Sequence, residues 1–302
     1  MALKDIKSKI KATERMHKVT RAMEAVSAAK MRKTQASALA GRSYARAALS
    51  ILTRLSATRH ITGHALAEHR EGSTLALIVI TSDKGLAGAL NSGVLKRAVE
   101  AIEGRAASDV TIFAYGKKGR DYFARRGYSI ARAYENKQDD VPLSIMEELS
   151  RDVTRGFLDK EFDKVVAVYS NFKSTFEQIP TMRRILPLSL PALEDIVAGI
   201  IPVKGMWSDV SIEPVPAAYE AEPSPEEVLD VLVPRLTAVA LYHMLLEAKA
   251  SEHSARMVAM KNASDSSKKV VGNLTRVYNR ARQAAITREV SEIVSGSEAL
   301  SS

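Results

Sequence analysis

A chain of 302 residues is long enough for one large domain or two ordinary ones, and its hydrophobic content of 46% is that of a folded protein. The absence of cysteine excludes disulfides and thiolate metal sites and favours a reducing compartment. The first residues are charged and the longest apolar runs are short, so neither a signal peptide nor a membrane-spanning helix is expected.

The net charge of +9 is unevenly distributed along the chain. Residues 1–59 carry 14 Lys and Arg against 3 Asp and Glu, and residues 249–302 carry 9 against 5, which leaves the middle with a net charge of −6. Basic ends around an acidic middle indicate either that the ends meet an acidic partner or that they form a solvated, lysine-rich coil.

Residues 1–59 are predicted to form a long helix. All ten prolines lie between Pro142 and Pro234, and residues 1–58 contain one glycine, Gly41. Proline costs about 3 kcal/mol and glycine about 1 kcal/mol inside a helix, so this stretch can remain helical. A stutter near Thr13 is expected to interrupt its apolar seam. The seam is predicted to contain Leu3, Ile6, Ile10, Met16, Val19, Met23 and Val26.

Residues 73–190 alternate strand-like and helix-like segments, which predicts a Rossmann-like α/β domain with a largely parallel sheet. Residues 191–223, which contain several prolines, are expected to form an extended return path. The predicted strands are 75–80, 110–115, 129–134 and 164–169, with an extended pair at 175–186, and the predicted helices are 92–102, 117–126 and 143–158.

Residues 224–296 predict a second long helix. Ser224, Pro225 and Glu227 have the spacing of an N-cap, a first helical residue and a capping-box glutamate. Pro234 is expected to kink the helix. Since the chain must return to its start, this helix is predicted to pair with residues 1–59 in an antiparallel coiled coil. Its heptad positions are Leu229, Leu232, Leu236, Val239, His243, Leu246, Ala250, His253, Met257, Met260, Ser264, Ser267, Val271, Leu274, Tyr278, Ala281 and Ala285.

The sequence contains no convincing catalytic, cofactor or metal site. The turn after residue 80 has only Gly85 and Gly88, and no P-loop motif occurs, so a structural turn is the favoured interpretation. The histidines His60, His64 and His69 share a connector, but their spacing fits no familiar zinc site.

Three segments together resemble the gamma subunit of F-type ATP synthases of the bacterial type. They are residues 6–31, which include TRAMEAVSAAKM, residues 81–91, TSDKGLAGALN, and residues 252–296, which include EHSARMVAMKNA and YNRARQAAITRE. The resemblance implies a non-catalytic rotor shaft on the cytoplasmic face of the inner membrane. It also implies the alpha and beta subunits of the catalytic head, the epsilon subunit and the membrane c-ring as partners, with no nucleic acid and no span through lipid.

The resemblance also assigns interface residues by position. It places the membrane c-ring against Tyr219 and Glu222, although Ala221 departs from the tyrosine of some relatives. It places the beta subunit against Arg280, Arg282, Gln283, Thr287, Glu289, Met23 and Arg256.

Two other functions stay open from the residues alone. A basic coiled coil could bind nucleic acid, although Tyr44 and Tyr278 are the only aromatic rings in the basic ends. An α/β enzyme with helical oligomerisation arms is the second alternative.

Overall fold

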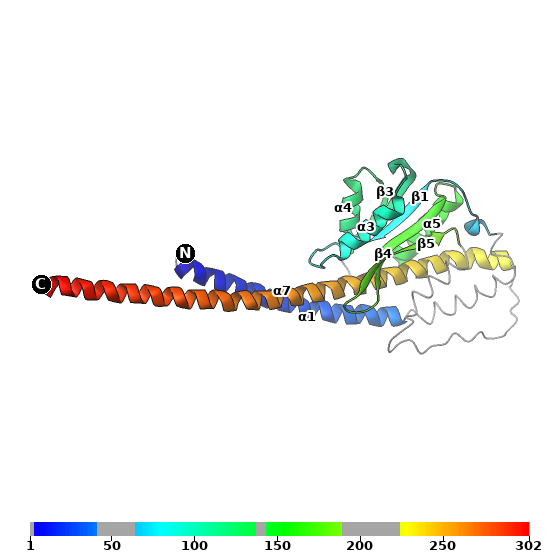
Figure 1. Cartoon of the computed structure of the whole chain (residues 1–302). Coiled ribbons are helices and arrows are strands. Elements are labelled where there is room, and N and C mark those ends of the chain that lie inside the picture. Colours follow the sequence, from blue (N-terminus) through cyan, green and yellow to red (C-terminus); the bar gives the residue numbers. More distant parts are fainter. Residues whose placement is uncertain (1–2, 41–63, 137–142, 189–223, 302) are drawn as a thin grey trace. The chain divides into compact units, whose positions relative to one another are not determined.

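The computed structural model describes residues 3–40, 64–136, 143–188 and 224–301 (Figure 1). They belong to two compact units: Ala28–Arg256, and Met1–Ser27 together with Met257–Ser302. The long helices α1 (Leu3–Ala40) and α7 (Pro225–Ser301) contribute residues to both. The predicted helix beyond residue 40 and the predicted return path at 191–223 lie outside the described residues.

The unit Ala28–Arg256 is built on a five-stranded sheet with the strand order β3-β2-β1-β4-β5. Strands β1 to β4 are parallel, and β5 runs antiparallel beside β4. This order confirms the predicted Rossmann-like domain, because strand order reverses beside β1 as it does in doubly wound folds. Its elements are η1 (Ala65–Ala67), β1 (Leu75–Ile80), α3 (Leu90–Ile102), η2 (Ala107–Asp109), β2 (Val110–Tyr115), α4 (Lys117–Ala124), β3 (Ser129–Tyr134), α5 (Leu143–Leu158), β4 (Lys164–Phe172) and β5 (Gln178–Leu186).

Both faces of the sheet are buried at its central strand β1, which is why β1 is an unbroken apolar run. Leu77 and Val79 point to the layer formed with α3 and α4, whereas Ile78 and Ile80 point to the layer formed with α5 and α7. Leu241 of α7 is fully buried in that second layer. The first half of α7 therefore serves as a helix of the α/β domain, which the heptad pattern alone did not predict.

The start of α7 has the predicted N-cap at Ser224 and one of the two bonds of the predicted capping box. The Glu227 backbone N–H donates to Ser224 Oγ at 3.2 Å, and Ser224 Oγ lies 3.4 Å from Glu227 Oε1. The helix continues through Pro234, whose carbonyl accepts a hydrogen bond from Ser150 Oγ at 2.8 Å. Pro234 thus lies inside one continuous helix, and its carbonyl is bonded to α5.

In the second unit, α1 and α7 run antiparallel (Figure 1). His17 Nδ1 lies 3.0 Å from both the carbonyl oxygen and Oγ of Ser264. The predicted heptad seam of α7 is confirmed here, since its positions are the protected ones. Met260, Ser264 and Ser267 are buried, and Val271, Leu274, Tyr278, Ala281 and Ala285 are half-buried.

The predicted seam of α1 is wrong at three of its four positions after Ile10, and only Met23 is half-buried. Met16, Val19 and Val26 are 61%, 57% and 55% exposed, respectively. The protected positions continue in a regular three-and-four spacing without a stutter, through Thr13, His17, Thr20 and Ser27. Small and hydroxylated side chains suit a close helix contact because their hydroxyls can bond within the helix, as Thr20 Oγ1 does to the Met16 carbonyl at 2.9 Å. Counting only apolar residues therefore selected the neighbouring face.

The corrected seam can be tested by alanine substitution in the whole chain. Ile6 is 2% exposed and Met16 is 61% exposed. We expect Ile6→Ala to lower the free energy of unfolding by about 2 kcal/mol or more, and Met16→Ala to change it by less than about 0.5 kcal/mol, in urea denaturation. If Met16→Ala lowered the free energy of unfolding more than Ile6→Ala does, the originally predicted seam would be correct.

Gly116 provides a test of the sheet edge. Its φ is +99°, and a Cβ there would lie 2.0 Å from the Thr81 carbonyl oxygen. Gly127 also has a positive φ, of +78°, but a Cβ there meets nothing within 4 Å. We expect Gly116→Ala to cost roughly 3 kcal/mol or more and the matched control Gly127→Ala about 1 kcal/mol, because only the first adds a clash to the backbone strain. Equal losses by chemical denaturation would contradict this account.

Candidate functional site

The carboxyl edge of the sheet is where a doubly wound domain ordinarily binds a ligand. The crevice lies where strand order reverses, here beside β1 and β4. The segments leading away from this edge begin at Thr81 after β1, Gly116 after β2, Glu135 after β3 and Lys173 after β4. Their contacts decide whether this edge is a ligand site.

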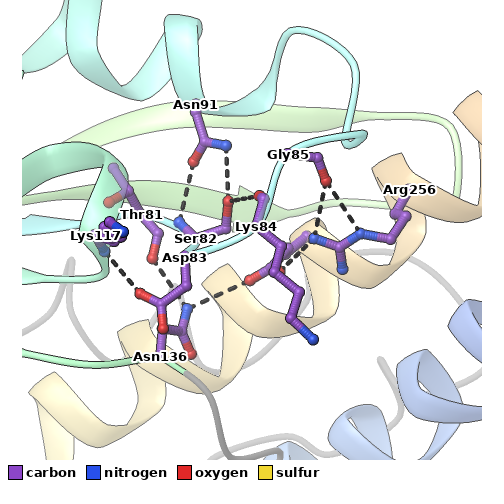
Figure 2. Close-up of polar contacts among 10 residues, drawn as sticks. Thr81, Ser82, Asp83, Lys84, Gly85, Asn91, Lys117, Asn136 and Arg256 are labelled. Atoms are coloured by element: carbon purple, nitrogen blue, oxygen red, sulfur yellow. Dashed lines mark hydrogen bonds and ion pairs between the residues drawn. The ribbon is translucent and has the colours of Figure 1, made fainter.

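The turn after β1 is held by its own polar groups (Figure 2). Asn91 Oδ1 accepts from the Ser82 backbone N–H at 3.0 Å, and Asn91 Nδ2 donates to Ser82 Oγ at 2.7 Å. Ser82 Oγ in turn donates to the Lys84 carbonyl at 2.6 Å. Leu86 and Gly88 have positive φ values of 63° and 57°, which make the turn tight. These contacts agree with the structural interpretation of the Gly85–Gly88 segment.

The same turn is joined to the start of α4. Asp83 Oδ1 accepts from the Lys117 backbone N–H at 2.7 Å, so a carboxylate lies at the positive end of that helix. Thr81 Oγ1 accepts from the Gly119 backbone N–H at 2.8 Å. The loops after β1 and β2 therefore form one bonded layer.

Helix α7 lies across this layer and occupies the crevice. Ser251 Oγ donates to the Ser170 carbonyl in β4 at 3.0 Å, and Ser254 Oγ donates to the Thr175 carbonyl after β4 at 2.6 Å. Arg256 reaches the Gly85 carbonyl after β1, with Nε and Nη2 at 3.4 and 3.5 Å. A segment of the chain itself thus takes the place that a nucleotide takes in related architectures.

A buried ion pair forms part of this contact. Arg256 Nη2 lies 2.6 Å from Glu252 Oε1, and the two side chains are 10% and 11% exposed. Asn136 Nδ2 donates to Glu252 Oε2 at 3.3 Å. It also donates to the Thr81 carbonyl at 3.0 Å (Figure 2). Burial raises the pKa of Glu252 above its ordinary value; the positive charges of Arg256 and Lys249 oppose this, and the charge of Asp83 adds to it.

The residues assigned to the beta subunit at the end of α7 are all on the surface. Arg280, Arg282, Gln283, Thr287 and Glu289 are exposed in the unit that contains the coil. The Thr287 hydroxyl donates back to the Gln283 carbonyl at 3.0 Å, which leaves its outer face available as an acceptor. These side chains can contact a partner without any change in the helix.

An apolar stripe at the end of α7 was missed by the sequence interpretation. Ile286, Val290, Ile293 and Val294 are 51%, 54%, 71% and 51% exposed. The heptad positions after Ala285 are polar, while these four residues recur at helical spacing on another face. This shift of the apolar residues to another face of the helix was the sequence signal that could have predicted the exposed stripe.

The other predicted site residues have different surroundings. Met23 is half-buried, and Arg256 is buried with the internal partners given above. Tyr219 and Glu222 lie outside the described residues, as does His60.

The histidine connector has a local role in the part of the chain that the structure describes. His64 Nδ1 accepts from the Leu66 backbone N–H at 3.2 Å, and His64 Nε2 lies 3.0 Å from Asp230 Oδ1. His69 is exposed, and among the described side chains no group of three or more His, Asp or Glu is placed to hold a metal ion.

The apolar content of α7 is accounted for largely by packing. The described segment Asp230–Ser297 is long and apolar enough to cross a membrane by length and composition alone, yet 56% of its most apolar window is buried inside the structure. The core helix of a soluble domain passes the same test.

Comparisons with known proteins agree with this architecture over the whole chain. The family model described as ATP synthase matches residues 2–300. The chain is 41% identical to the ATP synthase gamma chain of Roseiflexus sp., covering 98% of each, and 38% identical to that of Pelotomaculum thermopropionicum, covering 99% of each.

Solved structures show the same relationship. A central stalk and c-ring structure of the Tetrahymena thermophila mitochondrial ATP synthase contains a chain that is 25% identical, with a TM-score of 0.60, covering 82% of this chain and 99% of that one. The rotor of the Euglena gracilis enzyme shares the fold at 18% identity, with a TM-score of 0.61, covering 94% of this chain and 98% of that one. From its full-length match, its fold and its paired helices, the chain belongs to the ATP synthase gamma chain family.

Proposed function

We propose that this chain is the central stalk of a proton-translocating F-type ATP synthase. It turns inside the head of alpha and beta subunits and couples proton flow through the c-ring to ATP synthesis and hydrolysis. The observation that carries this proposal is the helical unit, in which α7 continues beyond its paired seam into an exposed tip. Residues 257–301 extend roughly 65 Å at 1.5 Å per residue, a suitable reach for a shaft.

The proposed role is not catalytic. Ser251, Ser254 and Arg256 of α7 cover the crevice at the carboxyl edge of the sheet. A ligand there would have to displace buried hydrogen bonds, which is costly. ATP chemistry therefore belongs to the catalytic head in this proposal.

The remaining partners follow from the family. We place the c-ring at Tyr219 and Glu222, include the epsilon subunit as a neighbour on the stalk, and locate the chain at the cytoplasmic face of the bacterial inner membrane. The family membership and the solved central stalks support these assignments at the level of the complex.

The tip would contact the beta subunits through exposed groups. Arg280, Arg282 and Gln283 are exposed on the described helix. Exposed ion pairs contribute only about 0–1 kcal/mol each, so such contacts can form and break as the shaft turns. Met23 and Arg256 complete the proposed beta-subunit contacts, although Arg256 already has buried internal partners.

The two alternative functions have weaker support. A full-length match to the gamma chains leaves little reason for a separate nucleic-acid role, and the filled crevice argues against an enzyme with an active site on this sheet.

The tip assignment can be tested in the assembled enzyme. We expect Arg280→Ala and Gln283→Ala to lower the rate of ATP synthesis severalfold, because each removes a group that meets the head. Both residues are exposed, so the free energy of unfolding of the isolated chain should change by less than about 0.5 kcal/mol.

Lys268→Ala is the matched control, since it removes an exposed charge from the same helix before the tip. Normal synthesis in both tip variants would refute the site assignment and leave the family intact. Purification of the chain without ATPase subunits, together with salt-sensitive DNA binding, would refute the rotor function.

A further inference from the structure

Four side chains within two turns of α7 attach it to the α/β domain. Counted with their backbone atoms, the residues Ser251 and Ser254 are fully buried and Glu252 and Arg256 are each 8% exposed. Each forms a hydrogen bond to a group outside α7. We call this segment, Ser251–Arg256, the joint.

The contacts of the joint reach both sides of the point where strand order reverses. Ser251 and Ser254 bond to carbonyls in and after β4, and Arg256 bonds to the Gly85 carbonyl after β1. Glu252 reaches Asn136, which follows β3. Since backbone carbonyls cannot change rotamer, these anchors fix where α7 lies and how it is rotated about its axis.

The ion pair adds a second constraint. Glu252 and Arg256 satisfy each other inside the protein, and each has a further partner on a different loop. Separating such a pair would leave an uncompensated buried charge. A small rotation of α7 relative to the sheet would disturb the pair and both of its loop contacts together.

Apolar packing alone would resist rotation less well. The hydrophobic contacts of α7 with the sheet, such as those of Leu241 and Leu245, hold the helix against the domain but have no preferred direction. Hydrogen bonds weaken steeply when their angle changes. The joint therefore holds α7 against twist with directional contacts at the carboxyl edge of the sheet, as the Ser150–Pro234 bond does near the start of the helix.

We infer that the joint transmits torque between the α/β domain and α7, with Glu252 and Asn136 as positioning residues. This inference rests on the proposed rotor function. Torque produced at the head by ATP hydrolysis must pass from α7 to the α/β domain before that domain can drive a membrane partner.

The test measures coupling in inverted membrane vesicles that contain the whole enzyme. In Asn136→Ala and Glu252→Gln variants we expect ATP hydrolysis to continue, while the number of protons pumped per ATP hydrolysed falls by roughly threefold or more, as lost charge-assisted bonds weaken the joint. Glu100→Gln is the matched control, because it breaks the exposed Arg97–Glu100 pair of α3 in the same domain.

A covalent link can replace the lost contact. The chain has no cysteine, so Asn136→Cys combined with Glu252→Cys gives the only two cysteines of this chain for a short bismaleimide. We expect the double variant to pump poorly before cross-linking and to recover most of its coupling afterwards. The control pair, Arg97→Cys with Glu100→Cys, should show neither the loss nor the recovery.

The possible outcomes distinguish the proposed role of the joint from the proposed rotor function. Normal coupling in both single variants would overturn the joint and leave the rotor function intact. Lost coupling that the cross-link does not restore would also overturn it, because the defect would then be general damage to the fold. Failure of the wild-type chain to copurify with the catalytic head would overturn the rotor function itself.

Discussion

The buried ion pair of Glu252 and Arg256, between α7 and the loops of the sheet, is the interaction on which the rest of the α/β unit depends. A charge removed from water must keep its partner, and these two side chains lie 2.6 Å apart. Because Arg256 also bonds to the turn after β1 and Glu252 to Asn136, the pair fixes α7 over the carboxyl edge of the sheet. The same placement fills the crevice that an enzyme of this architecture would leave open. One packing arrangement thus both fills the place of a ligand and anchors α7 to the sheet.

Helix α7 meets three environments along one continuous helix, and its sequence changes with each. Residues 238–256 are buried on most sides, since they pack against the sheet and the loops at its carboxyl edge. Between Ser264 and Ala285 only the heptad positions are protected, which is the pattern of a helix with a single partner. Residues 286–297 are exposed throughout. The low aromatic content of 5% agrees with this gradation, because Tyr278 is the only aromatic residue among the seam positions of α7 in residues 257–285.

Short-range patterns in the sequence predicted most of the elements. The apolar run at 75–80, the capping box at Ser224 and the heptad of α7 are local signals, and each has a local cause. The seam of α1 was mispredicted because its buried positions, such as Thr20 and Ser27, are polar residues whose hydroxyls can bond within the helix. The joint could not be predicted at all. Its partners are 116 positions apart for Asn136 and Glu252 and 171 apart for Gly85 and Arg256, and a single sequence carries no sign of which distant residues meet.

A rotor needs firm contacts where it carries torque and weak ones where it turns, and solvent exposure can supply both from the same chemistry. Arg256 and Arg280 have the same side chain on the same helix. Arg256 is buried with a carboxylate, where separating the pair costs about 3–5 kcal/mol. Arg280 is exposed, where an ion pair with a partner contributes only about 0–1 kcal/mol. In the proposed stalk, burial rather than residue type therefore decides which arginine holds the domain and which one releases its partner at each step.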